Sequence, residues 1–191
     1  MLGLLLLLLF IPLLIVSTFF NLAIFSFARM GLSPAGAMLL LTASIIGGFI
    51  NIPLSSRRIY EQQTPLGHFP FIFYRPPRVS YQVLCLNVGG GVIPILFSLY
   101  LLSTRAPLVP TLIATAIVAF AAKRLARVVP GVGITIPTLI PPIIAALTAM
   151  VVAPDNAPAV AYIAGAMGIL IGADILNLGA IRKLQSQVVS I

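Results

Sequence analysis

The sequence predicts an all-α membrane protein, a bundle of about six transmembrane helices with segments kinked or broken at glycine and proline. Three observations support this fold class. Of the 191 residues, 60% are hydrophobic and only 7% are charged, and the apolar residues fall into six long runs. Soluble domains are about one quarter charged. Eleven basic and three acidic side chains do not cover the surface of a soluble fold, so we expect lipid to cover most of it.

A bilayer-spanning helix needs about 20 mostly apolar residues, because its backbone polar groups must be satisfied within the segment. Six stretches qualify, and they make one transmembrane domain over residues 1–191. The predicted spans are approximately 2–28, 34–54, 79–103, 108–122, 134–153 and 157–181. The first lacks the basic leader of a signal peptide and is interpreted as a retained span. The fourth is the shortest and ends at Lys123, so it thins the bilayer or lets that side chain snorkel.

Glycine and proline interrupt the second, third and fifth spans. Gly47-Gly48 precedes Pro53, Gly89-Gly90-Gly91 precedes Pro94, and Gly131 and Gly133 precede Pro137 and Pro141-Pro142. Such clusters release backbone groups that neighbouring helices or water must satisfy, so we expect kinks or broken helices there. In the sixth span, Gly165, Gly168 and Gly172 are spaced three and four residues apart. This spacing predicts a face that packs closely on another helix.

The basic residues predict the orientation in the membrane, because Lys and Arg stay on the cytoplasmic side. One side receives only Arg29 and Arg105. The other side receives Arg57, Arg58, Arg75, Arg78, Lys123, Arg124, Arg127, Arg182 and Lys183. With six spans, both termini are therefore expected in the cytoplasm, and the protein is expected in the cell inner (plasma) membrane.

The predicted cytoplasmic loop, residues 55–78, combines arginines with aromatic residues. It contains Arg57, Arg58, Arg75 and Arg78 and the run Phe69-Pro70-Phe71-Ile72-Phe73-Tyr74. We expect an interfacial segment whose arginines meet anionic lipid headgroups. Docking of a membrane-protein partner, or of a second copy of the chain, is the alternative.

Asp174 is the only carboxylate within a predicted span, and an acid at membrane depth is by default a candidate functional residue. Asn87 of the third span is expected at a similar depth, Asn51 lies near the cytoplasmic end of the second span, and Asn177 lies three residues beyond Asp174 on the same helical face. Two interpretations remain open. The four side chains form a hydrogen-bond network that fixes helix packing, or they form a proton-handling, ion-handling or catalytic site.

Other chemistries find little support in the sequence. The net charge of +8 suggests nucleic acid, but the basic residues lie in short breaks between apolar runs and not on one readable face. The single Cys85 and the single His68 do not predict a disulfide or a metal site, and no cofactor is predicted. An aspartyl protease needs two neighbouring carboxylates, whereas Asp155 and Glu61 are both in predicted loops.

Three motifs carry a family resemblance. They are Gly47-Gly48-Phe49-Ile50-Asn51-Ile52-Pro53-Leu54, Asn87-Val88-Gly89-Gly90 followed by Ile93-Pro94, and Gly172-Ala173-Asp174 with Leu176-Asn177. Together they resemble an uncharacterised family of prokaryotic membrane proteins, the domain of unknown function sixteen-fourteen, over nearly the whole chain. The resemblance implies no established activity.

The resemblance also implies that family members continue beyond the equivalent of Ser190-Ile191 into a Gly-rich stretch with Phe-Asp-Gly and a further apolar span. It leaves open whether this chain is a piece of a longer protein. A second aspartate in such a span would give a layout similar to presenilin-type intramembrane aspartyl proteases.

Three functional hypotheses follow from the sequence. The first is a transport or ion- or proton-handling protein with a polar site at Asp174 in the cytoplasmic half. The second is a scaffold or accessory subunit of a membrane complex, and the third is the N-terminal part of an intramembrane protease. The sequence favours the first over the second by a small margin.

Overall fold

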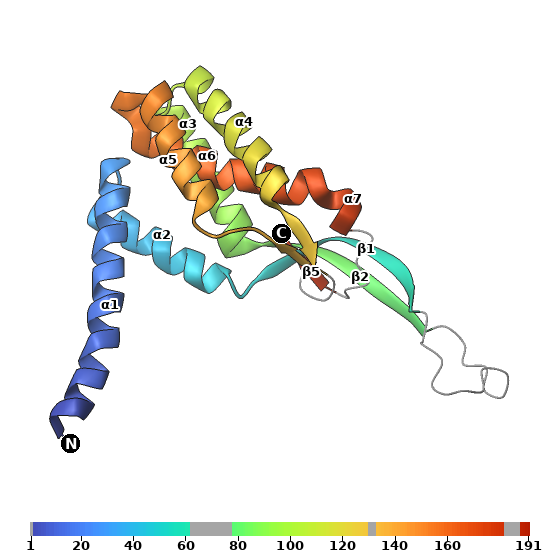
Figure 1. Cartoon of the computed structure of the whole chain (residues 1–191), viewed down its shortest axis with the longest axis horizontal. Helices are drawn as coiled ribbons and strands as arrows, with labels where there is room; N and C mark the ends of the chain where they lie inside the picture. The colour runs from blue at the N-terminus through green and yellow to red at the C-terminus, as the bar shows by residue number, and fades with distance from the viewer. Residues whose placement is uncertain (1, 62–77, 130–132, 182–187) are drawn as a thin grey trace.

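The computed structural model describes residues 2–61, 78–129, 133–181 and 188–191 of the chain. Most of these residues are helical, and the helices form a bundle from which α1 and a long β-hairpin project (Figure 1). The α-helices are α1 (Leu2–Arg29), α2 (Pro34–Gly47), α3 (Ile93–Thr104), α4 (Leu108–Leu125), α5 (Ile140–Val152), α6 (Ala157–Ile169) and α7 (Leu178–Ile181). The prediction of a mainly helical protein is therefore confirmed.

Strands are present as well, so the prediction of an all-α fold is wrong in this respect. A three-stranded sheet has the order β1 (Asn51–Glu61), β2 (Arg78–Asn87) and β5 (Val188–Ser190), with β2 antiparallel to β1 and parallel to β5. A second, two-stranded sheet pairs β3 (Arg127–Val129) with β4 (Gly133–Thr135). The predicted helices over 34–54, 79–103 and 134–153 are thus shorter than expected, and the predicted loop 55–78 begins as strand.

The physical reason lies in the sequence of β2. Polar Arg78, Ser80 and Gln82 alternate with Val79 and Tyr81, which is the two-residue period of a strand rather than of a helix. The apolar run that follows hides this alternation. Antiparallel pairing with β1 then satisfies the backbone along the hairpin, with a register shift between Pro53 and Ser55.

Two helical segments widen into π turns. The first, η1 (Val88–Val92), leads into α3, and the second, η3 (Leu170–Asp174), follows α6. Two single turns of 3-10 helix, η2 (Pro154–Asn156) and η4 (Ile175–Asn177), flank α6 and η3. The interruptions expected at the glycine and proline clusters are therefore present, as the end of α2 at Gly47 and as η1.

Three helical stretches of the described chain are long and apolar enough to cross a membrane, namely Phe10–Arg29, Leu108–Leu125 and Pro154–Ile181. Three shorter apolar helices accompany them, Pro34–Gly47, Val88–Thr104 and Ile140–Val152. The 14 residues of α2 give a helix of roughly 21 Å, whereas a bilayer core is about 30 Å thick.

The loops that join α1 to α2, α3 to α4 and α5 to α6 gather at one end of the bundle, away from the sheets (Figure 1). Gly31 adopts φ +91° in the first of these loops, a conformation that glycine enters without strain, and Ser33 Oγ accepts a hydrogen bond from Gly36 N at 3.1 Å to cap α2. Met30, Ala106 and Ala153 are buried in one common core at this end.

α1 stands apart from the bundle along most of its length (Figure 1). None of its Phe10–Arg29 stretch is buried in the protein, and apolar side chains such as Leu8 and Leu22 are exposed. Its last turns form the link to the bundle, where the Phe27 ring lies 5.7 Å from the Phe97 ring and 6.1 Å from the Tyr162 ring.

α4 packs closely on α6 and on η3, because α6 presents Gly168 and η3 presents Gly172 to it. A Cβ at Gly168 would lie 2.7 Å from Val118 Cβ, and a Cβ at Gly172 would collide with the carbonyl group of Ala119. Gly165 differs, since a Cβ there would meet Ala145 at an ordinary 3.7 Å. Two of the three glycines predicted as packing residues therefore lie where no side chain fits without movement.

These contacts predict opposite effects for the same substitution at two positions. We expect Gly172→Ala to reduce the free energy of unfolding by about 1–3 kcal/mol, because the backbone of α4 must move to admit the methyl group. Gly165→Ala is the matched control, and the helix propensity of alanine should leave its stability equal or higher by up to about 1 kcal/mol. Thermal unfolding in detergent measures both, and equal midpoints for the two variants would contradict the close approach.

Candidate functional site

Asn87 joins two broken helix ends. Its Nδ2 donates to Gly48 O at 2.8 Å, just beyond the end of α2, and to Asn51 Oδ1 at 3.1 Å. Its Oδ1 accepts from Gly90 N at 2.7 Å and so caps η1. Glycine at position 89 permits this approach, because a Cβ there would collide with Ser44 O. The structure thus brings Asn51 and Asn87 together, with their side chains bonded at the helix breaks.

The Asn177 side chain bonds to the backbone of the preceding turn of its own helical segment. Its Nδ2 donates to Gly172 O at 3.1 Å and to Ala173 O at 2.9 Å. Both carbonyls belong to the π turn η3, where the ordinary spacing of backbone hydrogen bonds is interrupted. The amide group therefore stabilises the irregular backbone that carries Asp174.

Asp174 is half-buried and ends η3. No hydrogen bond between described residues involves its carboxylate. The side chain lines a cavity of about 540 Å³, which we call the Asp174 cavity. The other residues that line it are Gly90, Pro94, Pro142, Ala145, Ala161, Tyr162, Gly165, Ala166, Ile169, Leu170 and Ile191.

Asp174 lies at the end of the π turn. In a π helix the backbone hydrogen bonds join residues i and i+5. Ile169 and Asp174 are five apart across η3, Leu170 and Asp174 are four apart, and all three residues line the cavity. Asp174 therefore continues the cavity-lining face of α6.

The four polar residues that were predicted to converge lie in different places: Asn51 and Asn87 bond to each other, Asn177 bonds to η3, and Asp174 lines the cavity. Gly90, which Asn87 caps, lines the Asp174 cavity together with Asp174. Among the residues described, the cavity lining does not include Asn51, Asn87 or Asn177. Sequence reasoning did not identify Tyr162, whose ring lies 4.9 Å from the Phe97 ring and whose side chain also lines the cavity. The sequence signal that could have identified Tyr162 is that it is the one tyrosine of the predicted apolar span 157–181.

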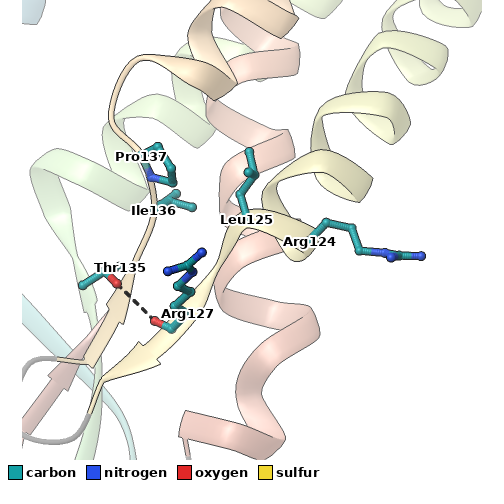
Figure 2. Close-up of a pocket in the computed structure, with 6 residues that line it drawn as sticks. All are labelled: Arg124, Leu125, Arg127, Thr135, Ile136 and Pro137. Carbon is teal, nitrogen blue, oxygen red and sulfur yellow. Dashed lines mark hydrogen bonds between the residues drawn. The ribbon is translucent and has the colours of Figure 1, made fainter.

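A second cavity, of about 410 Å³, lies where α4 ends and the β3–β4 hairpin begins. Figure 2 shows the Arg127 side chain pointing into the space beside Leu125 and Ile136, while the Arg124 side chain points away. Thr135 Oγ1 donates to Arg127 O at 3.3 Å across the hairpin. The Arg124 guanidinium instead lies over the Phe120 ring, 5.2 Å from its centroid. This second cavity is thus basic, whereas the Asp174 cavity is acidic.

The arginines predicted to meet lipid headgroups lie partly within the described chain. Arg57 and Arg58 are adjacent on β1, opposite Gln82 and Tyr81 of β2, and both are exposed. Arg58 lies 6.0 Å from the centroid of the Tyr81 ring. The backbone of Arg78 begins β2, and Arg75 and the aromatic run 69–74 lie outside the described residues.

The acidic residues of the described chain belong to three separate elements. Asp155 lies in η2 at the start of α6, so roughly 28 Å of helix separates it from Asp174. Glu61 ends β1, opposite Arg78. Across the described residues no three His, Cys, Asp or Glu side chains gather where they would hold a metal ion.

The comparisons with known proteins agree with the three motifs. The model of a family described as "Protein of unknown function (DUF1614)" matches residues 45–191, which is most of the chain. No curated protein and no solved structure matches.

The bonds of Asn87 predict that it is a structural residue. We expect Asn87→Ala to reduce the free energy of unfolding by about 1–3 kcal/mol, because Gly48 O and Gly90 N lose their partner at a helix break. Asn21→Ala is the matched control, since Asn21 lies exposed on α1 and bonds only to Ser17 of the same helix. Thermal unfolding of both variants in detergent is the measurement, and a midpoint for Asn87→Ala as high as that of the control would contradict the role.

Proposed function

Because the chain belongs to the DUF1614 family of proteins of unknown function, we propose its function from the site itself. The protein is a multi-pass membrane protein that binds and moves a proton or another cation at Asp174. The observation that carries the proposal is a half-buried carboxylate that faces a largely apolar cavity from a π turn. Carboxylates at membrane depth mark ion and proton pathways, and π turns occur frequently at functional sites.

The electrostatics of the cavity support a cationic ligand. No Lys, Arg or His is found among the described residues that line it, so none of these residues supplies a cation to neutralise Asp174. A carboxylate in apolar surroundings needs a proton or a cationic partner. An incoming proton or cation supplies that partner, and its release restores the charge.

The distribution of basic residues supports six crossings with both termini in the cytoplasm. α1 and α3 end at the loop end of the bundle (Figure 1), and Arg29 and Arg105 are the residues at these ends. α4 ends toward the sheets, and the basic residues Arg57, Arg124 and Arg127 belong to β1, to the end of α4 and to β3. Basic residues concentrate on the cytoplasmic side of membrane proteins. In this orientation Asp174 lies in the cytoplasmic half of a protein of the cell inner membrane.

The other two hypotheses have less support. A protease dyad needs two carboxylates close enough to share a proton. Asp155 and Asp174 are separated by the length of α6, so the protease hypothesis rests on a second aspartate in the further span that the family resemblance implies. A scaffold role would dock a partner through the small-residue face of the sixth predicted span and through the arginine-rich loop, but Gly168 and Gly172 of that face already pack against α4 within the chain.

The decisive experiment follows proton flux in liposomes that contain the full chain and an entrapped pH-sensitive dye, under an imposed potassium diffusion potential. We expect the native protein to conduct protons above the level of protein-free liposomes, and Asp174→Asn to fall to that level. Asp174→Glu keeps a carboxyl group and should retain flux. Asp155→Asn is the matched control and should behave as the native protein.

Two results would overturn this function. One is an Asp174→Asn flux equal to that of the native protein. The other is a native flux no higher than that of protein-free liposomes.

A further inference from the structure

We propose that the ligand of the Asp174 cavity is an amphipathic organic cation, with a positively charged head at the carboxylate and an apolar chain along α6. This inference rests on the proposed function, because it assigns Asp174 to cation binding. It goes further by naming the chemical class of the cation. This inference is supported by the extent of the cavity lining along α6 and by the apolar character of most of the lining residues.

The residues that line the cavity extend along one face of α6. Along α6 the lining residues Tyr162, Gly165, Ala166, Ile169 and Leu170 repeat at intervals of three, one, three and one, which is a single face of a helix. Asp174 continues this face across the π turn. From Tyr162 to Asp174 the face extends roughly 18 Å, about the length of an alkyl chain with a head group.

The wall that faces α6 has few groups that can form hydrogen bonds with a ligand. It contains Gly90 and Pro94 from η1 and α3, and Pro142 and Ala145 from α5. The side chains of these residues are apolar or absent, and proline has no backbone N–H. Asp174 supplies the one charged side chain among the described lining residues, and apart from the Tyr162 hydroxyl group the side chains of the described walls are apolar. This lining matches a molecule that is charged at one end only.

A dehydrated inorganic cation fits the same residues poorly. Hard cations such as Ca²⁺ take about six to eight oxygen ligands. The side-chain oxygens of the described lining are those of Asp174 and Tyr162, which lie twelve residues apart. The nearby carbonyls of Gly172 and Ala173 already accept from Asn177. An ammonium-type head needs only the single charge, because its apolar substituents take the place of oxygen ligands.

The size of the cavity agrees with this class. Small-molecule sites in proteins occupy about 300–1,000 Å³ and are mostly apolar, with a few polar groups that set orientation. The Asp174 cavity, at about 540 Å³, lies within that range. The second cavity, at Arg127, would repel the same ligand.

The test measures binding by calorimetry to the full chain in lipid nanodiscs, with empty nanodiscs as the blank. The probes share one tail or one head: octyltrimethylammonium, octanol, octyl sulfate and tetramethylammonium. We expect saturable binding of octyltrimethylammonium at least about tenfold tighter than binding of any of the other three. Equal affinity for octanol or octyl sulfate would overturn the inference, and so would equal affinity for tetramethylammonium.

Variants assign the head and the tail to their places. In Asp174→Asn, octyltrimethylammonium and octanol should bind within about threefold of each other, because the charge preference is lost. Ala166→Leu fills the groove and should weaken octyltrimethylammonium binding about tenfold. Arg127→Gln lies in the other cavity and should bind as the native protein does. A charge preference that persists in Asp174→Asn would overturn the inference.

The two proposals fail separately. Proton flux that depends on Asp174, without preferential binding of the amphipathic cation, overturns this inference and leaves the proposed function standing. Flux that does not depend on Asp174 overturns the proposed function, and with it the basis of this inference.

Discussion

Every backbone polar group in an apolar protein must find a partner, and this constraint shapes the structure around Asp174. In a regular helix the backbone N–H and C=O groups bond to each other. At the two π turns this pattern is interrupted, and asparagine side chains supply hydrogen bonds to the backbone, Asn87 at η1 and Asn177 at η3. Each turn is then stable enough to bring a residue to the cavity, Gly90 from one and Asp174 from the other. The chemistry proposed for the Asp174 cavity depends on the hydrogen bonds that these two asparagine side chains make to the backbone.

The helical part of the fold was predictable because apolar length is a strong signal. The first, fourth and sixth spans were predicted close to their observed helices, and the breaks at glycine were expected. The hairpin was not predicted, because the apolar end of β2 from Val83 to Leu86 resembles a helix of the same length. The pairing of β5 with β2 joins residues about a hundred positions apart, as Val83 with Val188. Local pattern carries no information on such a contact.

The candidate site was predictable in its residues and not in its geometry. Asp174 stands out from composition alone, since it is the one acid in an apolar span. The sequence placed three asparagines beside it as equal members of a site. In the structure Asn87 and Asn177 bond to backbone groups at the helix breaks, and Asn51 bonds to Asn87. The helical period groups Tyr162, Ile169 and Asp174 near one face of α6, but it does not indicate that residues of η1, α3 and α5 enclose a cavity against that face.

The glycine contacts between α6 and α4 also have a mechanical consequence. A helix seated against the Ala119 carbonyl group cannot slide or rotate past it, because no space remains for an intermediate position. The wall of the Asp174 cavity that carries Asp174 is therefore held in place against α4. The η1 part of the other wall is held in the same way, because a Cβ at Gly89 would collide with Ser44 O. Close backbone contacts at glycine thus fix the cavity on two sides.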